Sequence, residues 1–325
     1  MRMWLVRNNA LGLLLAAVLA GCAGPSPTAP PHDVPLASVM SPTASQQPSL
    51  LYVSNASNVT VYTYNNGNGI KQVGTLTGFT SPGGMCTDNA GNVWITDYYS
   101  RKVYEYAHGG SAPIATLTQH LGYPYACAVD NATGNLAVSY EHPDGHYRDY
   151  AEVLIYGKGS KFGSPYGPKN GFYRAYFLAY DDQSNLYTTG NACGDYQCYF
   201  ASYLHLFKLA RGQSMFKIVL GVRQSAPSTI AWVNPFFLMG TGSSGNSSVQ
   251  ALKIQVAGYR ATVTEKLPFA QTFLTYGFTR RASLVIVPDF AANAVQIYRL
   301  SDGSLVSTFT QGLDQPFSAV VSEKG

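Results

Sequence analysis

Residues 88–106 read Asp88-Asn-Ala-Gly-Asn-Val-Trp-Ile-Thr-Asp-Tyr-Tyr-Ser-Arg-Lys-Val-Tyr-Glu-Tyr106, and their pattern indicates the type of fold. Its first five residues are Asp, Asn, Ala, Gly and Asn, the residue types that tight hairpin turns need. Two short runs rich in β-branched and aromatic residues follow, Val93–Asp97 and Lys102–Tyr106, and such runs favour strands. The stretch therefore predicts a hairpin turn followed by two antiparallel strands.

The same pattern recurs along the chain at intervals of 42, 43, 50, 51 and 47 residues. Its first strands are Leu51–Asn55, Val93–Asp97, Leu136–Tyr140, Leu186–Gly190, Phe237–Thr241 and Leu284–Pro288. A second alternating strand follows each of them, and a third follows in most units. After the first unit, a hairpin joins the first strand to a preceding inner strand. Four strands in every 40–50 residues is typical of the blades of a β-propeller.

The two ends of the repeat region complement each other. The first unit lacks an inner strand, whereas Pro316–Val321 has the inner-strand pattern with no strand after it. A closed ring accounts for both, because an open stack would leave two bare sheet edges. We therefore predict an all-β fold over residues 50–325: a six-bladed β-propeller of four-stranded antiparallel blades, closed by the C-terminal strand completing blade 1.

The repeat resembles the NHL type, on the stretch above and again on Val285–Asp289 with Asn293–Tyr298. The chain is also distantly similar to the gluconolactonase and virginiamycin B lyase propellers. That resemblance implies metal-binding Glu, Asp and Asn around an axial channel, where the inner strands begin, with an added His in the lyase. The matching positions here hold no carboxylate and no His; they are Ser81–Gly84, Tyr123–Tyr125, Phe172–Arg174, Ala226–Ser228, Thr272–Leu274 and Gln315–Phe317. Fold resemblance alone does not carry chemistry over.

The N-terminus has the pattern of a targeting segment. Arg2 and Arg7 precede an apolar run at 10–20, which is shorter than the about 20 residues that a membrane span needs. The run ends in Leu19-Ala-Gly-Cys22, which resembles a bacterial lipobox. We expect a signal peptide at 1–21 and a lipidated, palmitate-bearing Cys22; an ordinary cleavage site with a chance cysteine is the alternative.

Residues 22–49 are expected to form the lipidated cysteine and a tether, because seven prolines lie among small polar residues there. The expected localisation is the bacterial cell envelope, with the membrane contacted through the lipid on Cys22. Ala23, rather than an aspartate, indicates the outer membrane if the organism is diderm.

Composition narrows the class of partner. Only 12% of residues are charged and the net charge is +4, with basic residues clustered at most in pairs. This excludes a nucleic-acid footprint. We expect no cofactor.

The candidate ligand-binding residues lie on the face where the inner strands begin. They are Tyr123, Tyr125, Phe172, Tyr173 and Arg174, together with His142, His146 and Arg148 in the loop at 140–150 and Tyr196 in the loop at 190–201. Plain inter-blade packing and solvated insertions are the alternatives for these aromatic residues and loops. His142 and His146 are weak candidates for a metal site, because a loop does not fix their spacing. We predict a binding scaffold for a protein or glycan ligand with no catalytic residues; the alternative is a metal-dependent lactonase- or lyase-like enzyme.

Five cysteines include Cys22, which leaves four. Cys193 and Cys198 share one loop and are candidates for a disulfide, with two free thiols as the alternative. Cys86 and Cys127 lie on neighbouring inner strands, and the sequence leaves open whether they form a bond or remain two buried thiols.

Overall fold

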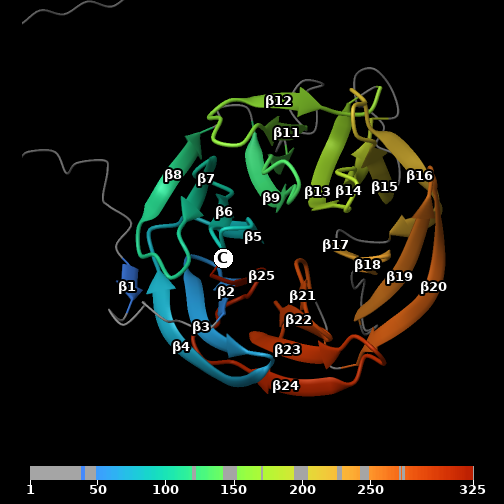
Figure 1. The fold of residues 1–325 in the computed structure, drawn as a ribbon. Helices are drawn as coiled ribbons and strands as arrows, with labels where there is room; N and C mark the ends of the chain where they lie inside the picture. Colours follow the sequence, from blue (N-terminus) through green and yellow to red (C-terminus); the bar gives the residue numbers. More distant parts are fainter. Residues whose placement is uncertain are drawn as a thin grey trace, which may run out of the picture. The chain divides into compact units, whose positions relative to one another are not determined.

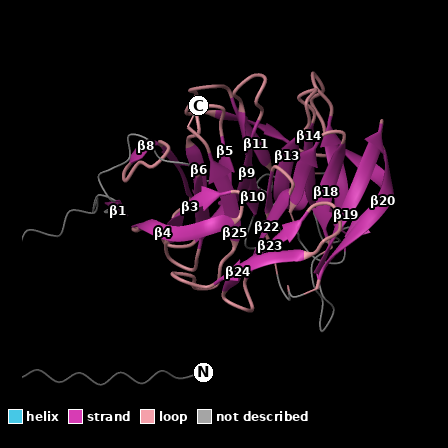
Figure 2. Ribbon diagram, turned by 60° about the horizontal axis from the view of Figure 1, so that its bottom comes forward, coloured by secondary structure: helices cyan, strands magenta, loops and turns pink. Residues whose placement is uncertain are grey.

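The computed structural model describes residues 38–40, 49–118, 122–141, 152–169, 171–193, 204–224, 229–241, 249–270, 272 and 275–324. All regular elements in these ranges are strands, β1–β25 (Figure 2). The chain divides into two compact units, 1–34 and 35–325, and the described residues all belong to the second. Among the described residues, no helix is long and apolar enough to cross a membrane. The prediction of an all-β fold is thus confirmed for the described part of the chain.

Consecutive strands pair antiparallel in runs of four. One sheet contains β5 (Pro82–Thr87), β6 (Val93–Asp97), β7 (Lys102–Tyr106) and β8 (Pro113–Thr118). Another contains β21 (Thr279–Arg281), β22 (Leu284–Asp289), β23 (Ala294–Arg299) and β24 (Leu305–Phe309). In each run the first strand lies nearest the middle in Figure 1 and the fourth lies outermost. The stretch 88–106 quoted first above contains the turn between β5 and β6 and the strands β6 and β7.

A longer sheet joins three such runs. The first run is β9 (Tyr123–Val129), β10 (Leu136–Glu141), β11 (Val153–Tyr156) and β12 (Gly163–Tyr166). The second is β13 (Phe172–Tyr180), β14 (Leu186–Ala192), β15 (Leu204–Leu209) and β16 (Lys217–Gln224). The third is β17 (Ile230–Val233), β18 (Phe236–Gly240), β19 (Val249–Ala257) and β20 (Arg260–Phe269). Single residue pairs connect the runs, Glu141 with Arg174 and Leu220 with Arg260.

The first sheet combines both ends of the described chain. Its order is β1 (Ser38–Met40), β4 (Asn68–Leu76), β3 (Val59–Asn65), β2 (Leu50–Ser54) and β25 (Ser318–Ser322). The C-terminal strand β25 pairs antiparallel with β2 along the whole length of both strands. The short strand β1 lies inside the segment expected to be a tether and pairs with β4.

The core lies between neighbouring runs. One apolar cluster joins Val103 and Leu117 of the β5–β8 run to Leu136 and Tyr156 of the next run, and other clusters join the other neighbours in the same way. Hydroxyl groups add a repeated link from the second strand of one run to the first strand of the next. These hydrogen bonds are Ser54 Oγ to Gly83 O (2.8 Å), Thr96 Oγ1 to Tyr125 O (3.0 Å) and Ser139 Oγ to Tyr176 O.

Close approach of the innermost strands requires glycine at one position. A Cβ atom on Gly84 of β5 would lie 2.6 Å from the Cβ of Ala126 on β9. On the same two strands, Cys86 and Cys127 form a disulfide, with their Cα atoms 5.6 Å apart. The alternative that the sequence left open is thereby resolved. Cys193 is buried and also disulfide-bonded; Cys198 lies outside the described residues, so their pairing stays a prediction.

Candidate ligand-binding site

Three strand ends meet at the face where the inner strands begin. β9 begins at Tyr123, β10 ends at Glu141 and β13 begins at Phe172. Glu141 pairs with Tyr123 on one side and with Arg174 on the other. We call this end of the runs the mouth, defined by Tyr98, Tyr99, Arg101, Tyr123, Tyr125, Glu141, Tyr173, Arg174 and Tyr176.

Glu141 is an acidic group of the mouth, and its side chain is only 12% exposed. The hydroxyl of Tyr98 donates to Oε2 at 2.9 Å, and Nε of Arg174 lies 3.8 Å from Oε1. Burial raises the pKa of the Glu141 carboxyl, against the opposing effects of the Tyr98 hydrogen bond and of Arg174. The inner-strand starts named in the sequence analysis hold no carboxylate, but Glu141 brings one to this face from the end of β10. The signal was present in the sequence, because Glu141 directly follows the strand pattern Leu136–Tyr140.

Aromatic rings form the outer part of the mouth. The ring of Tyr98 stacks on that of Tyr123, with centroids 4.8 Å apart, and Tyr99 meets both rings edge-on. The guanidinium of Arg101 lies 4.6 Å from the centroid of Tyr123 and donates to its hydroxyl at 3.0 Å. Tyr99 is 66% exposed, so this cluster presents a large aromatic side chain to a ligand.

Sequence reasoning missed Tyr98, Tyr99 and Arg101 as site residues. They belong to the connection between β6 and β7, which reaches the mouth because successive connections in an antiparallel run alternate between its two ends. The strand pattern alone therefore places Tyr98, Tyr99 and Arg101 at this end of the run. It does not predict that Tyr98 stacks on Tyr123, because Tyr123 belongs to the next run.

Deeper in the mouth, Tyr125 contacts a second set of rings. Its ring centroid lies 5.3 Å from Tyr176 and Phe177 and 5.5 Å from Phe317, which in turn stacks on Tyr276 at 4.9 Å. Burial raises the pKa of the Tyr125 hydroxyl well above its ordinary value, so this group stays protonated. These deeper rings pack between neighbouring runs, which is the alternative to ligand binding given for the aromatic residues in the sequence analysis.

The candidate ligand-binding residues on β13 do not all lie at the mouth. Tyr173 is half-buried, with the Arg174 guanidinium 5.4 Å from its ring centroid. Phe172 is only 1% exposed and packs edge-on against Phe207 at 5.0 Å, in the core. Phe172 therefore does not face a ligand at the mouth, because a register shift between Phe172 and Arg174 turns the two side chains apart.

Several predicted residues lie outside the described part of the chain, namely His142, His146, Arg148, Tyr196 and Cys22. Within the described ranges, no group of three or more His, Cys, Asp or Glu side chains could hold a metal ion. A cavity of about 210 Å³ lies along the innermost strands and is lined by β5, β9, β13, β17 and β25, with Ala126 and Ala179 among its small side chains.

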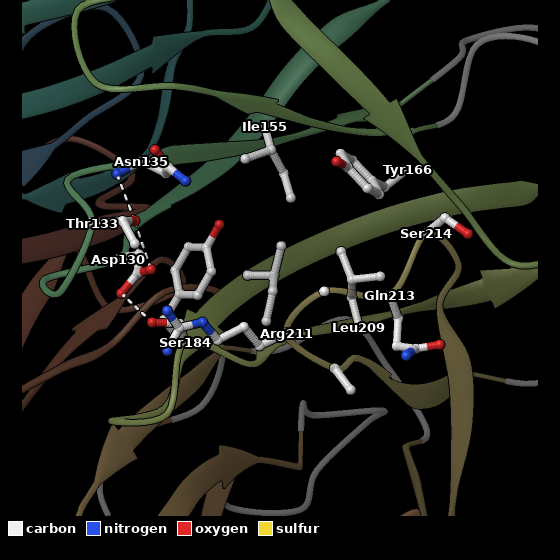
Figure 3. Close-up of a pocket in the computed structure, with 14 residues that line it drawn as sticks. Asp130, Thr133, Asn135, Ile155, Tyr166, Ser184, Leu209, Arg211, Gln213 and Ser214 are labelled. Atoms are coloured by element: carbon white, nitrogen blue, oxygen red, sulfur yellow. Dashed lines mark hydrogen bonds between the residues drawn. The ribbon is translucent and has the colours of Figure 1, made fainter.

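The opposite end of the runs, where the hairpins of Asp88, Asp130 and Asp181 lie, is called the turn end. These aspartates form the turns: each accepts the main-chain N–H two residues further on, at 2.9–3.1 Å. A cavity of about 420 Å³ lies there between the runs of β9–β12 and β13–β16 (Figure 3). Thr133 and Ser184 hold the Asp130 carboxylate at its edge, and Arg211 extends along the same side.

Comparison with known proteins supports the architecture. No protein-family model matches the chain, and no curated protein matches it. A chain in the crystal structure of a nidogen/laminin complex is similar over 85% of this chain and 99% of its own length, with a TM-score of 0.64 and 12% identity. A protein of unknown function from Bacteroides caccae is similar over the same shares, with a TM-score of 0.61 and 9% identity. Both fit a β-propeller fold, so this chain has a β-propeller-like fold.

The Glu141 carboxyl predicts a pH-dependent contribution to stability. Its pKa in the folded state is raised above the ordinary value of 4.5, so the folded protein binds this proton more tightly than the unfolded chain does. Wild-type protein should therefore gain stability as the pH falls through the raised pKa toward 4.5. Glu141→Gln keeps an acceptor for Tyr98 and lacks this contribution. In urea unfolding, the free energy of unfolding of the variant should exceed that of wild type most at neutral pH, and this difference should shrink on acidification. A difference that does not change with pH would contradict the assignment.

Proposed function

We propose that this chain is a lipid-anchored binding scaffold of the bacterial cell envelope, in which a closed six-bladed propeller presents the mouth to a ligand. The runs of four strands, the pairing of β25 with β2, and the cavity along the innermost strands support a ring of six blades. The NHL-like repeat of residues 88–106 is in keeping with this assignment. The lipobox-like Leu19–Cys22 supports the anchor.

The chemistry of the mouth favours a polypeptide ligand over a glycan. Protein interfaces are enriched in Tyr and Arg, and the residues that dominate binding energy are often of these types. The mouth combines the exposed Tyr99 with Arg101 and with Arg174, whose side chain is 41% exposed. The single observation that carries the proposal is the Tyr98–Tyr123 stack beside the buried Glu141. The stack and the strand ends hold these groups in place, so little side-chain entropy is lost on binding.

Site-specific photocrosslinking in intact cells tests this proposal. A benzoyl-phenylalanine at position 99 should crosslink to the ligand and give a product of defined mass. Proteases should digest the crosslinked ligand, because it is a polypeptide. The same group at Leu220, an exposed position on β16, is the matched control and should not give that product. Tyr123→Ala removes the stack and should reduce the product from position 99 severalfold. Identical products from positions 99 and 220, or none from 99, would overturn the proposal, and a protease-resistant adduct would show a glycan instead.

The anchor has its own test. Cys22→Ala removes the thiol that would be acylated, and several acyl chains give stable membrane attachment where one is marginal. We expect the variant to remain unprocessed or to leave the membrane fraction, as judged by its mass and by fractionation. Ser26→Ala, in the same segment, should fractionate like wild type. Equal fractionation of Cys22→Ala and wild type would refute lipidation.

A further inference from the structure

A second cavity at the turn end is a groove of about 790 Å³ between the β5–β8 and β9–β12 runs. We call it the Trp94 groove. β9 begins at the mouth and reaches this groove with its last residue, Val129, so the two sites lie at opposite ends of the same strands. The indole of Trp94 is half-buried on the cluster that includes Leu117, Leu136 and Tyr156. An aromatic ring thus lies over an apolar floor in an accessible cavity.

Hydrogen-bond acceptors form one wall of the Trp94 groove. Glu105 pairs directly with Trp94 across β6 and β7, so both side chains lie on the same face of the sheet. The Nδ2 group of Asn92 donates to Glu105 Oε1 at 3.1 Å and to Asp88 Oδ2 at 2.9 Å. Burial and, secondly, the charge of Asp88 raise the pKa of the Glu105 carboxyl. Among the described residues, Asn92 donates to the Glu105 carboxylate. A carboxylate accepts several hydrogen bonds, so Glu105 can also accept from a ligand in the groove.

Hydrogen-bond donors form the opposite wall. Lys158 and Lys161 come from the connection between β11 and β12 and line the groove. The alkyl chain of Lys158 packs over Gly134, because a Cβ atom there would lie 2.9 Å from its Cδ. Within the described ranges, neither lysine forms an ion pair with Asp88 or Glu105. The two walls therefore offer unlike groups to whatever lies between them.

Two cross-links hold the walls at a fixed separation. The Cys86–Cys127 disulfide joins the inner strands of the two runs within the cluster beneath the groove. The Nδ2 group of Asn89 donates to Asn131 O at 2.7 Å, which ties the two hairpin turns together at its edge. A groove between separate blades is thus held in one shape before a ligand arrives, and such preorganisation lowers the entropic cost of binding.

We propose that the Trp94 groove is a saccharide-binding site. A sugar ring offers an apolar face to the indole, and its hydroxyls both donate and accept. The same hydroxyls can therefore donate to the Glu105 carboxylate on one wall and accept from the lysine ammonium groups on the other. The two pairs of opposite charges cancel, so the site needs no net charge on its ligand. Its volume is within the range of about 300–1,000 Å³ that is usual for ligand pockets.

An array of short oligosaccharides, probed with the purified mature protein, tests this site. We expect wild type to retain at least one saccharide, and Trp94→Ala to weaken it by about tenfold or more, as loss of an aromatic contact should. Trp94→Phe should retain part of the affinity. Ala115→Trp fills the groove from β8, because Ala115 pairs with Glu105 and lines the cavity. That variant removes no native side-chain contact and should abolish retention while its thermal unfolding stays cooperative.

Two control variants test whether the loss of binding is specific to the groove. One replaces a tryptophan outside the groove, and the other alters the mouth. Trp232, whose Nε1 bonds Asp182 at 2.7 Å, lies outside the groove, so Trp232→Phe should bind like wild type. Tyr99→Ala, at the mouth, should also bind like wild type, whatever becomes of the polypeptide ligand proposed there. The saccharide site is overturned if wild type retains no saccharide above the level of Ala115→Trp, or if folded Trp94→Ala binds unchanged. Groove-dependent retention of peptides alone on a parallel peptide array would also overturn it.

Discussion

Deleting residues 315–325 is expected to abolish cooperative folding. The deletion removes β25, which pairs with β2 and places Val320 in one apolar cluster and Ala319 in the next. Ser318 N also donates to Ser54 Oγ on β2 at 3.1 Å, which adds to the pairing within the sheet, whereas Val320 and Ala319 connect this sheet to its two neighbouring runs. Without it, β2 becomes a bare edge beside exposed apolar surface, which favours aggregation. Light scattering and a thermal melt should show aggregates and no sharp transition.

A shorter deletion provides the matched control. Removing only 323–325 keeps β25 and loses the partly exposed Arg281–Glu323 ion pair, which should cost less than about 1 kcal/mol. This control should remain monomeric with a near-normal melt. If the longer deletion were equally monomeric and melted like wild type, β25 would contribute little and the proposed ring closure would lose its main support.

Removing the Cys86–Cys127 disulfide should have the second-largest effect. The bond closes a loop with a sequence separation of 41 residues, for which the chain-entropy relation gives about 4 kcal/mol of stabilisation. Cys86→Ala with Cys127→Ala should lower the free energy of unfolding by that order. The slope of the urea dependence should also rise, because an unfolded chain without the cross-link exposes more surface.

The single variant Cys127→Ala separates the bond from the packing of its sulfurs, since Cys86 remains in place as a thiol. It should lose nearly as much stability as the double variant. A loss below about 1 kcal/mol in both would show that the cross-link does not constrain the unfolded chain as the loop-entropy relation assumes. Because the bond lies beneath the Trp94 groove, the double variant should also bind any groove ligand more weakly.

Local sequence patterns predicted the strands and turns well. The hairpin 88–92 and the strands Val93–Asp97 and Lys102–Tyr106 lie where the pattern put them, because their signals are contained in adjacent residues. The prediction that a C-terminal strand pairs with the first unit rested on repeat counting, and β25 does pair with β2. The sequence likewise placed Tyr123 and Arg174 where inner strands begin.

Contacts between runs could not be predicted in the same way. A register shift between Ser139 and Tyr140 sets which residue of β10 lies opposite Tyr123, and it brings Glu141 there. A shift of one residue reverses which face a side chain occupies, so a small irregularity decides whether a group lines the mouth or enters the core. Phe172 entered the core for this reason.

The all-β class, the repeat and the hairpin turns of this protein can be predicted from its sequence, because each depends on residues near one another in the chain. The Cys86–Cys127 bond, the stacking of Tyr98 on Tyr123 and the place of Glu141 at the mouth follow from the folded structure alone. Those contacts join residues some 20–45 positions apart in the sequence. They depend on how closely neighbouring runs approach and on the register of each strand, which no local pattern encodes.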